Sequence, residues 1–166
     1  MNPTQLSREL REAQTPDLQN RRRIIGLSLL GVAAGQIVTL YQTGIIKRLP
    51  DPPIPYIDSN KVNASDYAYK RLDTPDAALM ILTYGVTVWL ASAGGKDRAQ
   101  RQPWLPVAMG LKTIADTATN LQLAKEEWDE NKAFCAYCQT ASLLSIASVA
   151  LAVPEMIKGF RNLFRR

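Results

Sequence analysis

Two cysteines separated by two residues are the side chains in this sequence whose type and spacing best fit a covalent redox chemistry. Cys135 and Cys138 stand three positions apart, so in a helix their sulfur atoms share one face and can meet. They open an apolar segment, and the partial positive charge at a helix N-terminus stabilises a thiolate. The pattern therefore predicts reversible thiol–disulfide exchange. Two other interpretations stay open here: a pair of buried small apolar residues, and half of a metal site that a partner completes.

The rest of the composition excludes several kinds of chemistry. The chain has 166 residues, about the length of one domain, and it contains no histidine. This absence removes His-based acid–base catalysis, Ser-His-Asp and Cys-His nucleophile systems, CxxCH haem attachment and His metal ligands. With only two cysteines, one chain can form neither a framework of several disulfides nor a four-cysteine zinc site. We therefore predict no metal site.

Long runs without charged residues predict that the cysteine pair belongs to a membrane protein. Three such runs cover residues 24–46, 77–95 and 133–154, and a fourth stretch, 103–124, is broken only by one lysine and one aspartate. A bilayer core of about 30 Å needs roughly 20 helical residues, so every run can cross it. A soluble helical bundle, the alternative, would interrupt these runs with a charged outer face. We expect an all-α fold, a four-helix transmembrane bundle with spans at about 24–46, 75–95, 103–124 and 134–154.

The positions of Lys and Arg predict the orientation of these spans. Basic clusters at 21–23 and 96–101 lie against predicted span ends, and the tail after Pro154 is basic as well. Because positive loops stay on the cytoplasmic side, both termini should be cytoplasmic, which puts the CxxC at the outer end of span four. Disulfides persist on that side. We expect three parts, namely a cytoplasmic segment (1–23), a four-span membrane domain (24–157) and a basic cytoplasmic tail (158–166).

The same reasoning predicts a multi-pass integral membrane protein whose first partner is the lipid bilayer. The apolar run after residue 23 is too long for the core of a cleavable signal, so we expect it to be the first anchor. The host membrane would be a bacterial plasma membrane, or a thylakoid membrane in a phototroph. Since topology explains the net charge of +5, no nucleic-acid partner is expected.

Shorter elements are expected outside the spans. Residues 4–14 can form a short polar helix on the cytoplasmic side. Four prolines within 50–55 exclude a helix and favour an extended segment, after which the polar stretch 58–73 can form a short helix over the outer span ends. We interpret the acids between spans three and four as a solvated turn: Glu126, Glu127, Asp129 and Glu130.

Taken together, these features resemble the vitamin K epoxide reductase family. The resemblance runs from about Ile24 to Glu155 and rests on four spans, a long outer loop after span one and a CxxC that opens span four. The matching stretches are LYQTGIIKRLPDPP (40–53), DSNKVNASDYAY (58–69), TPDAALMILTYG (74–85) and KAFCAYCQTASLLS (132–145). The resemblance implies a four-helix bundle that holds a lipid quinone (menaquinone, ubiquinone or plastoquinone) beside the CxxC and passes electrons from thiols to it.

Carried over residue by residue, the resemblance makes Cys135 and Cys138 the candidate catalytic residues. Cys138 would face the quinone, and Cys135 would exchange with an incoming dithiol. The family often has a Thr-Thr-Tyr-like run after the second cysteine, where this chain reads QTAS. The tyrosine contact to the quinone is therefore missing, and Thr140 is the candidate quinone contact in this run.

A second departure concerns the source of electrons. Family members usually have another cysteine pair in the loop after span one, which shuttles electrons to the CxxC. The corresponding stretch, about 58–65, has no cysteine, and we expect no thioredoxin-like domain after span four. The dithiol should then come from a separate thioredoxin-like or substrate thiol protein.

Span three carries further candidates for the cofactor site. Lys112, Asp116 and Asn120 recur at four-residue spacing, so the first two can pair on one helix face. A charge inside a membrane helix costs roughly 2.5–3.5 kcal/mol and usually faces a bundle interior or a cavity. One interpretation is the wall of a quinone site or proton path; the other is an ion pair near the interface of a partly embedded helix.

Two functions of different classes remain. The first hypothesis is a membrane thiol–disulfide oxidoreductase that passes electrons from dithiols to a lipid quinone through Cys135 and Cys138. The alternative is a non-catalytic accessory subunit, with the same fold, of a larger membrane protein complex. The missing loop cysteines and the missing tyrosine favour the alternative, whereas the CxxC favours the first.

Overall fold

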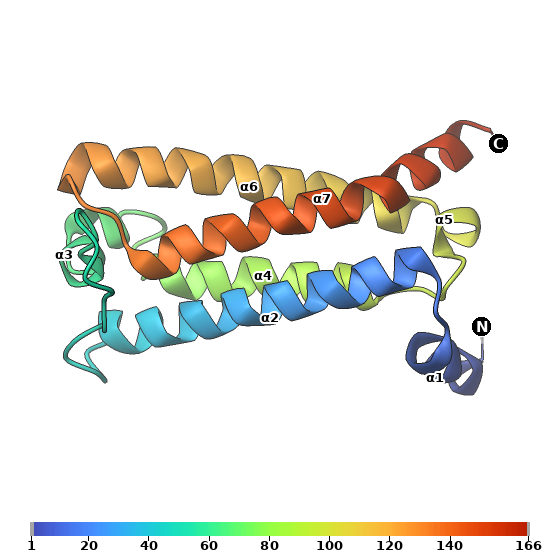
Figure 1. Ribbon diagram of the computed structural model, residues 1–166, viewed down its shortest axis with the longest axis horizontal. Coiled ribbons are helices and arrows are strands. Elements are labelled where there is room, and N and C mark those ends of the chain that lie inside the picture. The colour runs from blue at the N-terminus through green and yellow to red at the C-terminus, as the bar shows by residue number, and fades with distance from the viewer. Residues whose placement is uncertain (1, 166) are drawn as a thin grey trace.

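The computed structural model describes residues 2–165, and within this range every regular element is a helix. Four long helices form the body: α2 (Pro16–Gln42), α4 (Asp76–Ser92), α6 (Trp104–Asn131) and α7 (Ala136–Phe164). The shorter elements are α1 (Pro3–Glu12), α3 (Ser59–Asn63), the 3-10 turn η1 (Asp66–Ala68) and α5 (Arg98–Arg101). Figure 1 shows the long helices side by side, with α3 at one end of the bundle and α1, α5 and both chain ends at the other. The predicted all-α fold is confirmed.

The outer surface of the bundle has the character of a membrane protein. Two helices, α2 and α7, are long and apolar enough to cross a membrane by length and composition, and α4 is a shorter apolar helix. Large apolar side chains lie exposed on the outer faces of all four long helices, among them Leu30, Leu82, Leu121 and Leu143. In water such faces would carry polar residues, so this surface fits a lipid environment.

Two helix ends differ from the span boundaries that the sequence predicts. Helix α2 ends at Gln42 instead of 46, because the chain turns at Gly44 with a φ of 79°. Helix α7 continues through Pro154 to Phe164, although a proline removes one backbone hydrogen bond. Contacts beyond the proline hold the helix: Glu155 pairs with Arg98.

A close approach of α2 and α4 allows a side chain to cross the bundle. At Gly31 an added Cβ would lie 2.6 Å from the ring of Tyr84, so only glycine leaves room for that ring. The Tyr84 hydroxyl then donates to the backbone oxygen of Ala141 at 2.6 Å and lies 3.0 Å from the hydroxyl of Ser145 on α7. The small residue thus lets one aromatic ring connect three helices.

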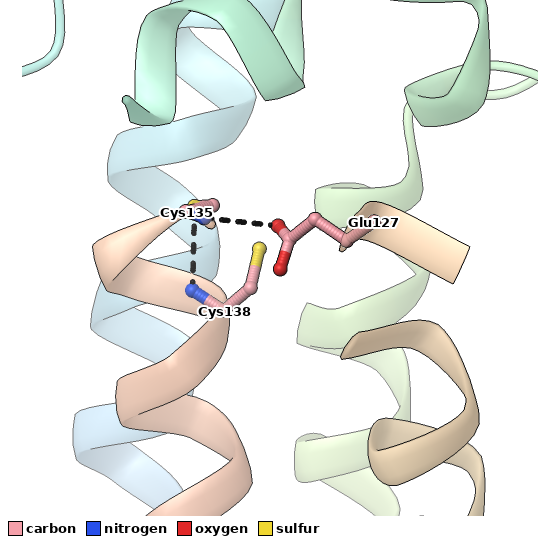
Figure 2. A group of neighbouring side chains, drawn as sticks. All are labelled: Glu127, Cys135 and Cys138. Carbon is pink, nitrogen blue, oxygen red and sulfur yellow. Dashed lines mark hydrogen bonds between the residues drawn. The ribbon is translucent and has the colours of Figure 1, made fainter. Parts of the chain in front are cut away.

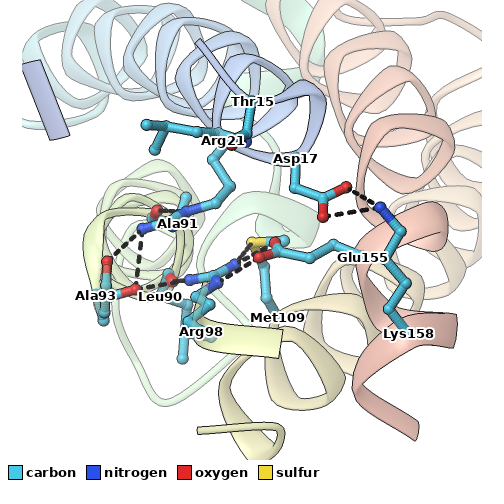
Figure 3. Close-up of polar contacts among 12 residues, drawn as sticks. Thr15, Asp17, Arg21, Leu90, Ala91, Ala93, Arg98, Met109, Glu155 and Lys158 are labelled. Carbon is cyan, nitrogen blue, oxygen red and sulfur yellow. Dashed lines mark hydrogen bonds and ion pairs between the residues drawn. The ribbon is translucent and has the colours of Figure 1, made fainter. Parts of the chain in front are cut away.

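Buried arginines organise the end of the bundle that carries α1 and α5. The guanidinium of Arg21 donates to the carbonyl oxygens of Ala91, Ala93, Gly94 and Gly95 at 2.7–3.0 Å. Arg98 donates to Leu90 and Ala93 and forms an ion pair with Glu155 (Figure 3). These donors satisfy the carbonyls that the end of α4 leaves without helical partners. Each of the basic clusters at 21–23 and 96–101 therefore contributes one arginine that stabilises this end of the bundle.

The ion pair of Arg98 and Glu155 yields a test of this arrangement. Both side chains are almost fully buried, so Glu155→Gln leaves the arginine charge without its partner. We expect the free energy of unfolding to fall by about 3–5 kcal/mol. The measurement is the loss of helical circular dichroism as the detergent-solubilised protein is titrated with sodium dodecyl sulfate.

The matched control removes an ion pair at the same end of the bundle that is largely exposed. Lys158 lies 2.7 Å from Asp17, and its side chain is 51% exposed. Lys158→Gln should lower the free energy of unfolding by less than about 1 kcal/mol. Equal losses in the two variants would contradict a structural role for the buried pair.

Candidate functional site

The two cysteines lie at the first turn of α7, and their sulfur atoms are neighbours. Cys135 is the N-cap residue, and its sulfur accepts a hydrogen bond from the backbone N–H of Cys138 at 3.3 Å. Both are free thiols in this structure; Cys135 is completely buried and Cys138 is half-buried. Their sulfurs lie within 4.8 Å of each other (Figure 2). The predicted proximity of the sulfurs at a helix start is thus what the fold produces.

The loop between α2 and α4 covers Cys135. Asn63 on α3 donates its side-chain amide to the Cys135 sulfur at 3.2 Å, and the Ser59 hydroxyl accepts the backbone N–H of Ala136 at 2.9 Å. Val62 and Tyr67 pack against the same cysteine. N–H donors of this kind stabilise a thiolate over a thiol. They also shield the sulfur, so a partner protein can reach Cys135 only if α3 moves.

A buried carboxylate completes the surroundings of the cysteines, and here the predicted solvated turn is wrong. Helix α6 continues to Asn131, and its last turns carry Glu127 into the interior, where it is 1% exposed. One carboxylate oxygen accepts the backbone N–H of Cys135 at 3.0 Å, and the other accepts the side-chain amide of Gln139 at 2.7 Å. The neighbouring acids Glu126 and Glu130 pair with Lys70 at the partly exposed outer surface.

The electrostatics of Glu127 follow from this burial. The residue lies beyond the predicted end of span three at 124, at the end of the bundle that carries α3. Desolvation is the largest effect and raises the pKa of its carboxyl to about 8; the nearby Cys135 acts in the same direction, against two hydrogen bonds that favour the ionised form. Near neutral pH this side chain can therefore both hold and release a proton.

A cavity of about 280 Å³ extends from the CxxC between α4, α6 and α7. Cys138 and Glu127 line its outer part, and Asp116 and Asn120 line it further along α6. Cys135 is not among its lining residues. The volume lies just below the usual range of small-molecule pockets, about 300–1,000 Å³, and the walls are mainly apolar with a few polar groups. A ring-sized headgroup with carbonyl oxygens fits this combination.

The polar residues predicted on span three are placed by contacts with α4 and α7. Lys112 forms an ion pair with Asp116, as the spacing predicts, and it donates to the Thr87 hydroxyl at 2.7 Å. Asn120 donates its amide to the Ser145 hydroxyl at 2.9 Å. Asp116 and Asn120 face the cavity, whereas Lys112 is not a lining residue and holds Asp116 in place.

Thr140 lies apart from these residues. Its hydroxyl donates to the backbone oxygen of Ala136 at 2.8 Å, and the side chain is exposed. It does not line the cavity. A quinone contact from Thr140 stays a prediction that this arrangement does not favour.

Three residues of the site have only weak signals in the sequence. Glu127 is one of four acids within five positions, and nothing local separates it from its solvated neighbours. Ser59 and Asn63 are ordinary polar residues of a polar loop. Asn63 contacts Cys135 and Ser59 contacts Ala136 across more than 70 positions of the chain, so only the tertiary structure identifies these two residues.

Glu127, Cys135 and Cys138 also place one potential metal-ligand atom each within 4.8 Å of the others. A closed structural zinc site takes four protein ligands. Only three such atoms gather here among residues 2–165, and both carboxylate oxygens already accept hydrogen bonds. We do not identify these residues as metal ligands.

Comparison with protein families agrees with the cysteine pair and the helical bundle. The model of the vitamin K epoxide reductase family matches residues 22–153, which is most of the chain, so the chain belongs to this family. Membership in this family implies a membrane protein of the class of thiol–disulfide oxidoreductases that use a quinone. No curated protein and no solved structure matches the chain.

The cover over Cys135 can be tested with a cysteine-reactive reagent. In Cys138→Ser, the remaining thiol of Cys135 should react with a polar maleimide at least about tenfold more slowly than an exposed reporter, because its sulfur is buried beneath α3. The reporter is Asp73→Cys in a chain whose two native cysteines are replaced by serine. Labelling rates are measured by mass shift in mild detergent.

Denaturation supplies the control for this comparison. In sodium dodecyl sulfate both thiols should react at similar rates, since neither is then covered. Similar rates in the folded proteins would contradict the cover.

Proposed function

We propose that this chain is a membrane thiol–disulfide oxidoreductase that passes electrons from the dithiol of a separate protein to a lipid quinone. The single observation that carries the proposal is the division of the cysteine pair between two surroundings. Cys138 lines the cavity, while Cys135 lies beneath the outer loop and does not line it. One sulfur thus borders the cavity, and the other is covered by the loop between α2 and α4.

The reaction balances in two steps. The dithiol of the partner protein reduces the Cys135–Cys138 disulfide through a mixed disulfide on Cys135, which leaves the partner oxidised and the CxxC reduced. The CxxC then gives two electrons and two protons to the quinone, which leaves as quinol, and the disulfide forms again. Cys135 and Cys138 are the catalytic residues of this proposal.

Contacts for the quinone headgroup come from the polar wall of the cavity. The side-chain amide of Asn120 is the hydrogen-bond donor that we assign to a quinone oxygen, and Asp116 lies one turn away on the same face of α6. Lys112 is a positioning residue, because its ion pair and its bond to Thr87 fix Asp116. Thr140 is left out of this set. The type of quinone is open between menaquinone, ubiquinone and plastoquinone.

Access for the partner protein requires a local opening of the outer loop. Helix α3 spans only Ser59–Asn63, and it contacts the cysteine turn through two hydrogen bonds and the packing of Val62. Short elements of this kind open at a lower free energy than the helices of a core. The partner is then a thioredoxin-like or substrate thiol protein on the outer side of the membrane, with both termini of this chain on the cytoplasmic side.

The accessory-subunit alternative is favoured by the burial of Cys135 and by the absence of further cysteines in this sequence that could relay electrons. Under this alternative the solubilised protein migrates at constant stoichiometry with a large membrane complex. Migration as a monomer in native electrophoresis counts against it.

The redox proposal is tested by following the thiols. Protein in detergent is reduced, freed of reductant and mixed with menadione, a soluble naphthoquinone. We expect one quinol for each protein molecule and loss of both alkylatable thiols in the wild type. Cys135→Ser and Cys138→Ser should give neither product. A wild-type protein whose thiols stay free after mixing would exclude the oxidoreductase function.

The quinone contact is tested on α6. Asn120→Leu removes the proposed donor and should raise the KM for menadione by about tenfold, which corresponds to ~1.4 kcal/mol, with kcat little changed. The control is Leu121→Ala, whose side chain is exposed on the outer face. Steady-state rates with dithiothreitol as electron donor give both constants. An unchanged KM in Asn120→Leu, or an equal rise in the control, would refute the contact.

A further inference from the structure

The reaction proposed above moves protons as well as electrons, and the sequence lacks the usual proton carrier. Oxidation of two thiols to a disulfide releases two protons, and reduction of a quinone to a quinol consumes two. Histidine commonly transfers protons at neutral pH, but this chain contains none. The question is which side chain beside Cys138 can take its proton and deliver it within the cavity.

Several titratable groups face this part of the cavity. They come from every element around it except α2, whose lining residue is Val38. They are Tyr67 and Arg71 on the loop between α2 and α4, Asp76 and Tyr84 on α4, Asp116 and Glu127 on α6, and Cys138 on α7. Cys135, which does not line the cavity, is the further titratable neighbour of Glu127.

Most of these groups are engaged elsewhere. The hydroxyl of Tyr67 donates to the backbone oxygen of Leu123, and burial raises the pKa of this phenol, which stays protonated. Asp76 accepts the side-chain amide of Gln42, and Asp116 is paired with Lys112. None of these contacts involves the cysteines.

Glu127 is the acid that contacts the cysteine turn directly. Its two hydrogen bonds, from the N–H of Cys135 and the amide of Gln139, fix both carboxylate oxygens relative to the CxxC. A carboxylate oxygen lies within 4.8 Å of both sulfurs, and Figure 2 shows the carboxyl group and the Cys138 sulfur turned toward one another. The same side chain lines the cavity.

We propose that Glu127 is the proton carrier of the CxxC pair: the protonated acid delivers its proton to a quinone oxygen in the cavity and then takes the proton of the Cys138 thiol as that sulfur gives up its electrons. Cys135–SH and Cys138–SH lose two electrons and two protons, the sulfur–sulfur bond forms, and the quinone becomes quinol. Glu127 passes two protons to the quinone in turn and is reprotonated first by the Cys138 thiol and then by the Cys135 thiol, so it ends in its starting state. This inference rests on the proposed quinone reductase function.

The burial of Glu127 suits this task. An acid with an ordinary pKa would be ionised near neutral pH and could accept a proton but not supply one. Burial raises the pKa of Glu127 to about 8, close to the pH at which the protein would work, so both directions are accessible. The protonated fraction falls as pH rises through this value, so a rate that depends on the protonated acid should fall with it.

The test is a single-turnover reaction of the full-length, pre-reduced protein in detergent with menadione, measured from pH 6 to 9. Glu127→Gln keeps the size of the side chain and an oxygen for the N–H of Cys135, and the amide of Gln139 can rotate to accept from the new amide. The variant cannot carry a proton. We expect its rate at pH 7 to be about a hundredfold below the wild type, with no decline above pH 8.

Two further variants separate proton transfer from structure. Glu127→Asp keeps a carboxyl group and should keep a pH-dependent rate. Glu130→Gln removes a carboxylate that is exposed and paired with Lys70, and it should behave as the wild type. If Glu127→Gln does not fold, Glu127→Asp decides alone: moving the carboxyl back by one methylene should slow the reaction at pH 7, and a wild-type rate would refute the proposal.

Three other results would contradict the role of Glu127 as proton carrier. A wild-type rate and pH profile in Glu127→Gln would overturn the proposal. So would a slow variant that keeps the decline above pH 8, because another group would then carry the proton and Glu127 would only position the turn. A wild-type protein that leaves menadione oxidised would refute the function itself and the proton carrier with it, which distinguishes that failure from the other two.

Discussion

The backbone N–H groups at the start of α7 donate hydrogen bonds to the same groups that form the candidate site. A helix N-terminus leaves backbone N–H groups without helical partners. Here the Cys135 sulfur takes the N–H of Cys138, Ser59 takes that of Ala136, and Glu127 takes that of Cys135 itself. Capping the helix and positioning the sulfurs are therefore one arrangement, and the cysteine turn cannot shift without leaving buried donors unpaired.

The two ends of the bundle contain backbone groups that need opposite hydrogen-bond partners. At the α7 start, backbone N–H groups need acceptors, and the carboxylate of Glu127 and the hydroxyl of Ser59 accept two of them. At the end of α4, carbonyl oxygens need donors, and Arg21 and Arg98 supply them. Backbone groups at such ends cannot rely on the lipid-facing environment for hydrogen bonds, so the chain provides its own partners. The family match covers residues 22–153 and includes the candidate site at the start of α7.

Local spacing predicted the features that depend on neighbours along the chain. The CxxC lies at a helix start with its sulfurs together, and Lys112 pairs with Asp116 across one turn, because i,i+3 and i,i+4 positions share a helix face. The proline-rich stretch contains no helix, and the polar loop forms α3 over the cysteine end of the bundle. The helical class followed from the lengths of the apolar runs.

The features that sequence reasoning missed depend on distant contacts. Pro154 should end a helix, yet α7 continues because Arg98, on a separate short helix, holds Glu155. Arg21 belongs to a basic cluster from which we predicted only the orientation of the spans, and its burial against the carbonyl oxygens at the end of α4 was not predicted. Helix propensity and charge patterns describe the local preference of a residue for a conformation or for water. Tertiary contacts can outweigh a local preference of a few kcal/mol.

Residue type and short-range spacing were enough to predict the helical class, the family, a CxxC pair with neighbouring sulfurs and the i,i+4 ion pair. Three features depend on the tertiary structure: which of the four acids within 126–130 is buried, the contact of Asn63 with the Cys135 sulfur, and the presence of Cys138 rather than Cys135 in the cavity wall. The physical reason is the same in each case. Burial and hydrogen-bond partners depend on which segments meet in space, and a helix turns successive residues about 100° apart, so one position along α6 separates a solvated carboxylate from one beside the cysteines.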